Sequence, residues 1–337
     1  MHAFELTRRL IDIESITPNE TEVGNFLFGY LTEMARRFDG KIERMPVETG
    51  RDNIFVHFDS PVVTLSTHMD TVPPFIPSRD DTDKIWGRGA CDTKGIIAAM
   101  ITAAEDLLQS GVRGFGLLFV VGEERNSAGA YAAARLPRGS RFLINGEPTE
   151  NQLALGSKGA LRYLIVGRGR MAHSAYPELG DSAILRLLNS LDRIRRVQLP
   201  TDALLGASTL NIGTINGGRA PNIIPDEAQA EMFIRVVGDV SELRTQIADA
   251  AQPDCEAKEV LFIPAVRLGA IDGLRTTVVA FTTDIPAFAN TWGQPFLIGP
   301  GSIHVAHTSG EYIPKDQLLE AVGIYKQMVI RLSQGQI

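Results

Sequence analysis

Three stretches of the sequence end a run of apolar residues with acidic or imidazole side chains. They are VVTLSTHMD (62–70), GLLFVVGEE (116–124) and RFLINGEPT (141–149). Continuous apolar runs of this kind are typical of strands that are covered on both faces. In an open α/β sheet, ligands bind beyond the carboxyl ends of the strands. We therefore expect the polar ends of these three segments to contribute to one site.

The side chains at these strand ends suit a metal centre. Imidazole nitrogen and carboxylate oxygen are the ligands that zinc, cobalt or manganese accept from a protein without paired thiolates, and Cys91 and Cys255 form no CxxC pair. Two ions about 3.5–4 Å apart can share a hydroxide nucleophile and stabilise an oxyanion. The candidate residues, which provide enough ligands for two ions, are His68, Asp70, Asp92, Glu123, Glu124, Glu147 and His307.

Spacing within these stretches suggests a division of roles. His68 and Asp70 lie two residues apart at a strand end and so point in the same direction. One of them can bind a metal while the other orients the imidazole ring through a hydrogen bond from outside the metal's ligand set. In the tandem Glu123-Glu124, one carboxylate can bind a metal while its neighbour faces the substrate as general base. Any one of these carboxylates by itself would ordinarily be a solvated surface group, so the interpretation depends on their joint occurrence.

The elements around these residues indicate an open α/β sheet. Apolar residues at helical spacing predict helices over 3–13 and 94–111, and residues 54–58 form a short strand candidate. Thr17-Pro18-Asn19-Glu20 reads as a capping box with proline at the first helical position of a second helix. The chain ends on another predicted helix, DQLLEAVGIYKQMVIRLSQ.

The pattern changes near residue 157, where strands and helices follow in the order β-α-β-β-α-β. We predict a small ferredoxin-like α+β domain over 157–265, inserted into a larger α/β/α domain formed by 1–156 and 266–337. The length of 337 residues agrees with two domains, at roughly 150 residues per domain.

Composition excludes several classes of protein. The formal charge of −7 offers no electrostatic footprint for nucleic acid, and no apolar run approaches the ~20 residues that cross a bilayer. The N-terminus reads as an amphipathic helix rather than a signal peptide, and the two cysteines lie far apart. We therefore expect a cytoplasmic protein that binds neither nucleic acid nor membranes.

Taken together, the motifs closely resemble those of the M20 family of metallopeptidases and deacylases. LSTHMDTVP, WGRGACDTKG, VVGEE and NGEPT are similar to its metal-site motifs in the same order. GRMAHSAYPELGDSAI and GTINGGRAPNIIPDEAQAEMFIRV are similar to its inserted lid, or dimerisation, domain, and GPGSIHVAHTSGEYI resembles the last metal motif of acetylornithine deacetylases. The resemblance implies a zinc-peptidase-like fold and covers about residues 5 to 330.

This resemblance assigns roles by position. It implies five ligands for two divalent metal ions, Zn²⁺ or alternatively Co²⁺: His68, Asp92, Glu124, Glu147 and His307. Asp92 would bridge the ions, Glu147 would join His68, and Glu124 would join His307. Glu123 would be the general base and Asp70 would hold the His68 ring. A cis peptide is implied between Asp92 and Thr93, and His304 is the competing candidate for the last ligand.

Further residues of the inserted domain and the pocket follow from the same likeness. His173 would reach the active site of a partner subunit in a homodimer and stabilise the oxyanion. Asn222 and Arg235 would hold the substrate, whose carboxylate a guanidinium can grip with two hydrogen bonds. Thr283 and Gly301 would line the pocket floor. These residues of the inserted domain are weaker assignments than the metal ligands. His173 can instead be a turn histidine between a strand and a helix, and Arg235 can be an ordinary strand arginine.

The function implied is hydrolysis of the N-acyl amide bond of a small amino-acid derivative. N-acetylornithine, an intermediate of arginine biosynthesis, is the first choice of substrate; N-succinyl-diaminopimelate, other acylamino acids and dipeptides are alternatives within the same chemistry. A binding protein that keeps the fold without the catalysis is a rival, although the base and all ligands are present here. A metal-free amino-acid-binding protein would leave the acidic strand ends unexplained.

Overall fold

The computed structural model describes residues 2–336, which divide into two compact units. The first unit contains the chain up to Leu155, Leu268–Thr277 and the chain from Thr283 onward. The second contains Gly156–Arg267 and Val278–Thr282. All the candidate metal ligands therefore belong to the first unit.

A mixed sheet forms the centre of the first unit, with neighbouring strands in the order β1-β2-β6-β3-β7-β19-β8. Strands β6, β3, β7 and β19 are consecutive neighbours and run parallel to one another. The strand bounds are β1 Lys41–Glu48, β2 Arg51–Phe58, β3 Val63–His68, β6 Phe115–Val120, β7 Phe142–Asn145, β8 Leu153–Ser157, β18 Thr276–Val279 and β19 Gln294–Leu297. The parallel strands in the middle of this sheet place their carboxyl ends along one edge.

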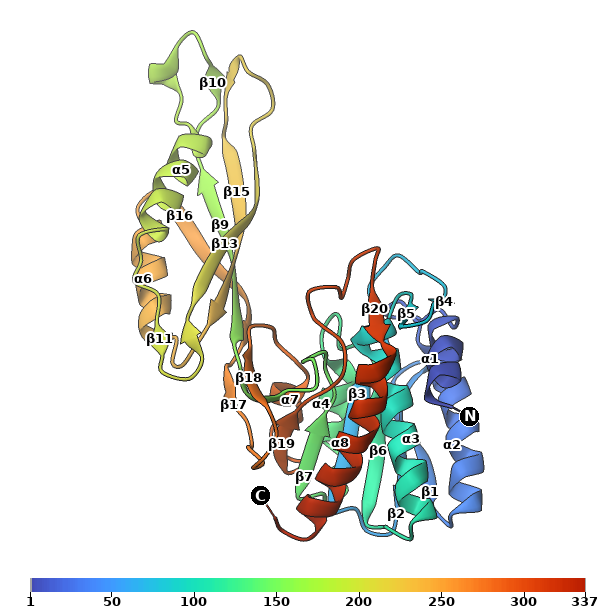
Figure 1. Cartoon of the computed structure of the whole chain (residues 1–337). Helices are drawn as coiled ribbons and strands as arrows, with labels where there is room; N and C mark the ends of the chain where they lie inside the picture. Colours follow the sequence, from blue (N-terminus) through green and yellow to red (C-terminus); the bar gives the residue numbers. More distant parts are fainter. Residues whose placement is uncertain (1, 337) are drawn as a thin grey trace. The chain divides into compact units, whose positions relative to one another are not determined.

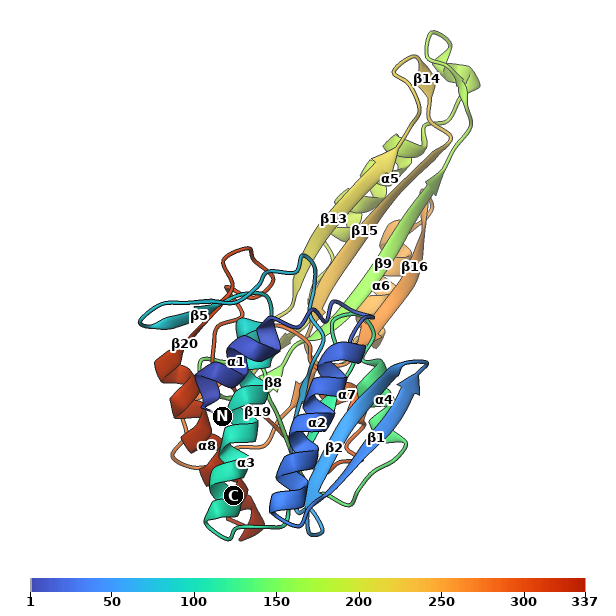
Figure 2. The same cartoon turned by 90° about the vertical axis from the view of Figure 1, so that its right-hand side faces the viewer.

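Helices cover both faces of this sheet (Figures 1 and 2). One face carries α1 (Ala3–Ile11), α2 (Thr21–Arg37), α3 (Gly95–Gln109) and α8 (Lys315–Ser333); the other carries α4 (Ala128–Ala134) and α7 (Ile285–Phe288). Strand β2 shows the cause, because Ile54 and Val56 pack in the first apolar cluster while Phe55, between them, contacts the second cluster beside Trp292. The predicted α/β/α fold class is confirmed.

One local prediction at the N-terminus is wrong. Helix α2 begins at Thr21, and its N-cap Glu20 makes no side-chain capping bond. The Thr17 hydroxyl donates instead to Asp70 Oδ2 at 2.6 Å, and the Glu20 carboxylate accepts from Arg51 Nε at 2.8 Å. Both side chains that would close the capping box are thus engaged by residues far away in the sequence, so the box does not form.

The second unit contains a four-stranded antiparallel sheet in the order β13-β15-β9-β16. Its elements are β9 Gly159–Arg168, α5 Ala183–Ile194, β13 Thr209–Gly217, β15 Glu227–Val236, α6 Ser241–Ala251 and β16 Cys255–Ile263. Leu161 and Ile165 of β9 pack with Leu187 of α5 and Ile247 of α6 in one buried cluster. This is the predicted β-α-β-β-α-β arrangement with both helices on one face of the sheet.

Short elements complete the two units. In the first, β4 (Arg79–Asp80), β5 (Lys84–Trp86) and β20 (Tyr312–Pro314) form a small sheet, and a π-helical segment spans Ala90–Lys94. In the second, the short pieces are β10 Ala172–His173, a 3-10 turn Pro177–Leu179, β11 Thr201–Asp202, β12 Gly206–Ala207, β14 Ile223–Ile224 and β17 Val266–Arg267. None of the helices between residues 2 and 336 combines the length and apolarity that a membrane-spanning helix needs.

Candidate metal centre

Three of the polar clusters meet because their strands are parallel neighbours. His68 is the last residue of β3, which lies between β6 and β7. Glu123 and Glu124 follow the end of β6, and Glu147 follows the end of β7. The carboxyl ends of parallel strands lie at the same edge of the sheet. The fold thus gathers residues that are up to 79 positions apart in the sequence, as the hydrogen bond from Thr67 to the Gly146 carbonyl illustrates.

Asp92 lies between two imidazole rings and presents one oxygen to each. Its Oδ1 is 3.0 Å from His68 Nε2, and its Oδ2 is 3.2 Å from His307 Nε2. Asp92 itself is buried and begins the turn into α3, where its peptide bond to Thr93 is cis as expected. A carboxylate in this position can bind two metal ions at once, with one histidine for each.

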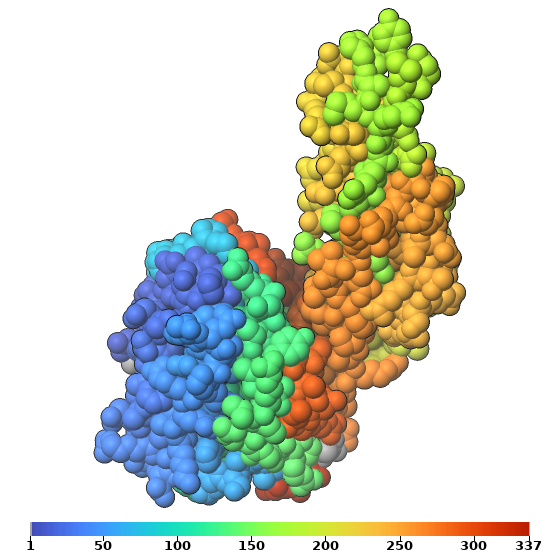
Figure 3. Space-filling view, turned by 180° about the vertical axis from the view of Figure 1, so that it is seen from behind, coloured from blue at the N-terminus to red at the C-terminus, as the bar shows by residue number. Residues whose placement is uncertain are grey.

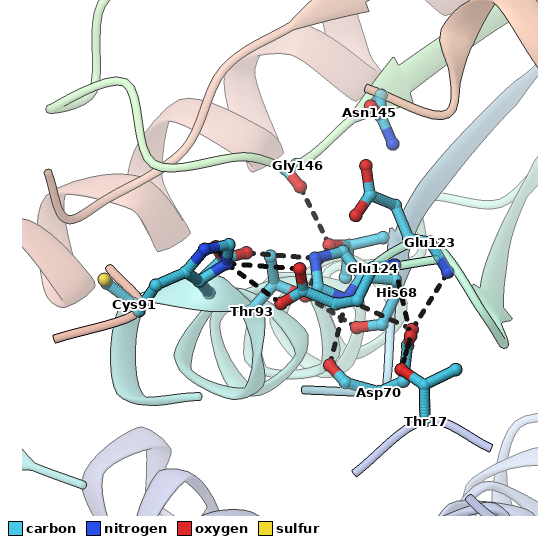
Figure 4. A network of polar contacts seen from close by, with 12 residues as sticks. Thr17, His68, Asp70, Cys91, Thr93, Glu123, Glu124, Asn145 and Gly146 are labelled. Atoms are coloured by element: carbon cyan, nitrogen blue, oxygen red, sulfur yellow. Dashed lines mark hydrogen bonds and ion pairs between the residues drawn. The ribbon is translucent and has the colours of Figure 1, made fainter. Parts of the chain in front are cut away.

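The last histidine of the group is His307. Its Nε2 is 3.1 Å from Glu124 Oε2, so Glu124 and Asp92 converge on the same ring (Figure 4 shows Glu124 in this network). His304, the competing candidate, makes no ion pair with a carboxylate in the described part of the chain, whereas His307 pairs with both Asp92 and Glu124. His68, Asp92 and Glu124 offer ligand atoms that all lie within 4.8 Å of one another.

Asp70 connects the His68 ring to the two glutamates (Figure 4). His68 Nδ1 is 3.0 Å from the Asp70 backbone carbonyl and 3.4 Å from its Oδ1. The same carboxylate accepts the backbone N–H groups of Glu123 and Glu124, each at 3.2 Å. Asp70 is fully buried. Its contacts leave His68 Nε2 as the nitrogen that faces Asp92.

The centre is strongly acidic, and this perturbs its titration. Burial raises the pKa of Glu123 and of Glu147 well above the ordinary glutamate value, and nearby carboxylates add to the rise. Hydrogen bonds to Asp92 and Glu124 raise the pKa of His307 to about 10. Burial lowers the pKa of His68, but its bonds to Asp70 and Asp92 outweigh that effect and leave the pKa well above normal.

The residues present fit a pair of divalent cations. Their donors are the oxygen and nitrogen atoms that zinc accepts. Glu147 Oε1 is buried and has no hydrogen-bond partner in the range 2–336, although buried polar groups are nearly always paired. The two imidazoles of His68 and His307 face a larger number of carboxylates, whose negative charge cations would neutralise. These carboxylates are Asp70, Asp92, Glu123, Glu124, Glu147 and Asp284.

Thr283 and Gly301 also lie in the first unit. Thr283 is buried, and its hydroxyl accepts the backbone N–H of Ile285 at 3.2 Å at the start of α7. Gly301 has a φ of +86°, and a Cβ placed on it would lie 2.5 Å from Cys91 Cβ. Gly301 therefore brings its loop close to the segment that carries Asp92; the pocket-lining role of either residue stays a prediction.

The remaining expected residues belong to the second unit. His173 on β10 pairs in register with Ile223 on β14, which follows Asn222. Figure 3 shows these two segments, in green and yellow, side by side at one end of that unit. Arg235 lies on β15 over the Phe233 ring, and its Nη1 is buried without a hydrogen-bond partner in the described chain. Their roles at the metal centre stay predictions.

Sequence reasoning missed three residues around the centre. Arg88 and Glu311 form a buried ion pair of 2.6 Å next to Asp92 and His307. Asp284 is buried, both of its carboxylate oxygens lack a hydrogen-bond partner among residues 2–336, and burial raises its pKa to about 7. All three lie inside stretches that the sequence had already singled out, WGRGACDTKG, HTSGEY and FTTDIPAF. Their position within these motifs was the sequence signal that could have identified them.

Comparison with known proteins agrees with this geometry. The model of peptidase family M20/M25/M40 matches residues 64–331. The chain belongs to this family. The family resemblance read from the motifs is thereby confirmed, and with it the class of the enzyme, a peptidase-family hydrolase.

Relatives of this M20 protein are similar over nearly its whole length. A peptidase M20 domain-containing protein of Schizosaccharomyces pombe is 40% identical over 96% of this chain and 83% of its own length. A probable carboxypeptidase of Aspergillus flavus is 36% identical over 96% of this chain and 85% of its own length.

Solved structures show the same fold. A tripeptidase from Staphylococcus aureus has a TM-score of 0.81 at 21% identity, with 99% of this chain and 98% of that chain covered. A dinuclear metal-binding peptidase of the M20 family from Bacillus subtilis has a TM-score of 0.71 at 16% identity, with 99% and 98% covered.

Proposed function

We propose that this protein is a dinuclear metal-dependent hydrolase that cleaves an amide bond next to a free α-carboxylate, as in the last peptide bond of a short peptide or in an N-acyl amino acid. The observation that carries the proposal is Asp92, with one oxygen facing His68 and the other facing His307. The similarity to probable carboxypeptidases supports the peptide form of the substrate. N-acetylornithine, an N-acyl amino acid, has the same reacting group.

Five residues would hold two divalent ions, zinc as the first choice and cobalt as the alternative: His68, Asp92, Glu124, Glu147 and His307. When bound, such ions polarise the scissile carbonyl and activate water. Asp70 keeps His68 Nδ1 occupied, so that the other ring nitrogen remains available as a ligand. The Asp70 carboxylate also accepts the backbone N–H groups of Glu123 and Glu124 and so restrains the position of the backbone that carries these two side chains.

Glu123 would act as general base and then as general acid. It takes the proton from water as the oxygen adds to the carbonyl carbon, and it returns the proton to the amine nitrogen as the C–N bond breaks. Burial among carboxylates raises the pKa of Glu123, which makes it a stronger base for taking the proton from water. No other candidate base follows β6 on the same turn, because Glu124 is engaged by His307.

Arg235 would bind the substrate carboxylate, and Asn222 would be a further substrate contact. Its guanidinium is desolvated, which lowers its pKa, and Nη1 has no protein partner within residues 2–336. A partly buried guanidinium with an unpaired nitrogen is costly, and a carboxylate would relieve that cost with a bidentate pair. Arg235→Ala should therefore raise KM about 10-fold or more for a dipeptide and leave KM unchanged for the same dipeptide as its C-terminal amide.

The second unit would form a homodimer and supply His173 to a partner's site. Ile215 on the edge strand β13 is 55% exposed, and Val260 on the other edge strand β16 is 51% exposed. Exposed edge strands are ready-made pairing surfaces. Equal mixing of a Glu123→Ala protein with a His173→Ala protein should restore part of the activity that each lacks. Sedimentation of the protein as a monomer only would contradict the proposed homodimer.

The two free, buried cysteines agree with a cytoplasmic location, which stays a proposal.

The decisive test uses the zinc-loaded protein and its Glu123→Gln variant. The wild type should bind two zinc ions and hydrolyse dipeptides, N-acetyl amino acids including N-acetylornithine, or N-succinyl-diaminopimelate. The variant should lose at least about 100-fold in kcat, since general acid–base catalysis contributes about 10²–10⁴-fold, while its zinc content stays at two. Full turnover in the variant would place the base elsewhere. A wild type without metal would refute the function.

A further inference from the structure

A buried ion pair connects the two chain segments that carry Asp92 and His307. Arg88 Nη1 is 2.6 Å from Glu311 Oε2, and both side chains are almost fully buried, 2% and 0% exposed. Arg88 precedes Asp92 by four residues, and Glu311 follows His307 by four. The pair is the same distance along the chain from each of these two residues, which contact each other at 3.2 Å.

Glu311 holds the Asp92 segment through its second oxygen. Its Oε1 accepts the backbone N–H groups of Cys91 and Asp92, each at 3.3 Å, and lies 3.7 Å from Cys91 Sγ. The backbone of Asp92 is thus attached to a carboxylate that comes from the loop after His307. These bonds act on the position of Asp92 without touching its side chain, which stays free to face the two histidines.

Arg88 holds the His307 segment in return. Its Nη2 donates to the His307 backbone carbonyl at 3.4 Å, and its Nε donates to the Pro74 carbonyl at 3.3 Å. His307 has a φ of +63°, in the left-handed region. Residues other than glycine keep such a conformation only where their surroundings hold it. The Arg88 contact to the carbonyl of His307 supplies one such restraint.

A buried ion pair is a poor device for stability alone, because apolar residues of the same volume often stabilise a protein equally well. Its value must then lie in where it fixes the chain. We infer that Arg88 and Glu311 are positioning residues that set the distance between Asp92 and His307, and hence the affinity of the metal ion these two would share. The inference rests on the proposed dinuclear centre.

The test measures metal binding by titration calorimetry and by the absorption spectrum of Co²⁺ added to metal-free protein. Glu311→Gln keeps an oxygen for the two N–H groups but turns an amide donor toward Arg88. We expect one of the two Co²⁺ ions to bind about 10- to 100-fold more weakly, the usual effect of losing an outer partner of a ligand, while the other ion binds as in the wild type.

Glu20→Gln is the matched control, since Glu20 forms a similarly buried pair with Arg51 in the same unit. It should lower thermal stability while both Co²⁺ affinities stay at wild-type values. If Glu311→Gln does not fold, Arg88→Lys replaces it; one ammonium group cannot reach Glu311 and the His307 carbonyl together, so the same single ion should bind more weakly.

Three results would overturn the inference. The first is wild-type affinity for both ions in a folded Glu311→Gln or Arg88→Lys protein. The second is an equal loss of affinity in Glu20→Gln, which would reveal general destabilisation. The third is a wild-type protein that binds no Co²⁺, which would refute the proposed function itself and is recognised before any variant is made.

Discussion

Replacement of Asp70 by asparagine is the sharpest probe of how this centre is built. The Asp70 carboxylate receives the Thr17 hydroxyl at 2.6 Å and two backbone N–H groups, from Glu123 to Oδ1 and from Glu124 to Oδ2. An asparagine amide has one oxygen and one NH₂ group. Whichever way it is turned, one of the two backbone N–H groups then faces a donor.

The expected magnitude follows from that mismatch. A hydrogen bond to a charged group contributes about 1.5–3 kcal/mol, and the lost bond lies in a fully buried position. About 1.4 kcal/mol corresponds to a factor of ten in rate. If losing this hydrogen bond displaces Glu123 or Glu124 and its full free energy is lost from transition-state stabilisation, kcat/KM should fall roughly 10- to 150-fold. Thr17→Val removes only the hydroxyl bond and should cost less than Asp70→Asn.

The assay compares kcat/KM, zinc content and thermal unfolding of each variant with those of the wild type. Asp59→Asn is the control for the chemical change, because Asp59 is exposed and pairs with Arg113 away from the centre. It should leave kcat/KM unchanged. A folded Asp70→Asn protein with wild-type kcat/KM would refute the idea that Asp70 positions the two glutamates.

Three further predictions concern the metal and its loop. Because the pKa of metal-free His307 is raised to about 10, the ring is protonated at pH 7, and zinc must displace that proton. Zinc affinity should therefore rise with pH up to about 10, and calorimetry in buffers of different ionisation enthalpy should show proton release; identical heats would contradict this. Removal of zinc by a chelator should lower the melting temperature, and zinc at 100 times its Kd should restore about 2.7 kcal/mol of stability. Gly301→Ala should reduce the free energy of unfolding in urea by at least about 1–3 kcal/mol, because its φ is +86° and its Cβ would meet Cys91 at 2.5 Å. Gly310→Ala, whose Cβ would meet nothing within 4 Å, is the control, and equal stabilities would contradict the packing argument.

Much of the fold could be predicted because its signals are local. The apolar runs of β3, β6 and β7 and the spacing of α3 and α8 stand in the sequence itself. The capping box at Thr17 shows where local reasoning ends. The same residues match the motif, but Asp70 and Arg51 compete for them, and no pattern within four residues reports a partner that is 53 or 31 positions away.

The sequence by itself determined which chemical groups the centre has and in what order the strands deliver them, because apolar runs that end in Asp, Glu or His need only neighbouring residues to be recognised. The tertiary structure decided which groups meet. It brought His307 and not His304 to Asp92, turned Asp70 toward both glutamates, and joined Arg88 to Glu311. These choices depend on the register of parallel strands and on the path of loops, and both are set by packing between segments far apart in the chain.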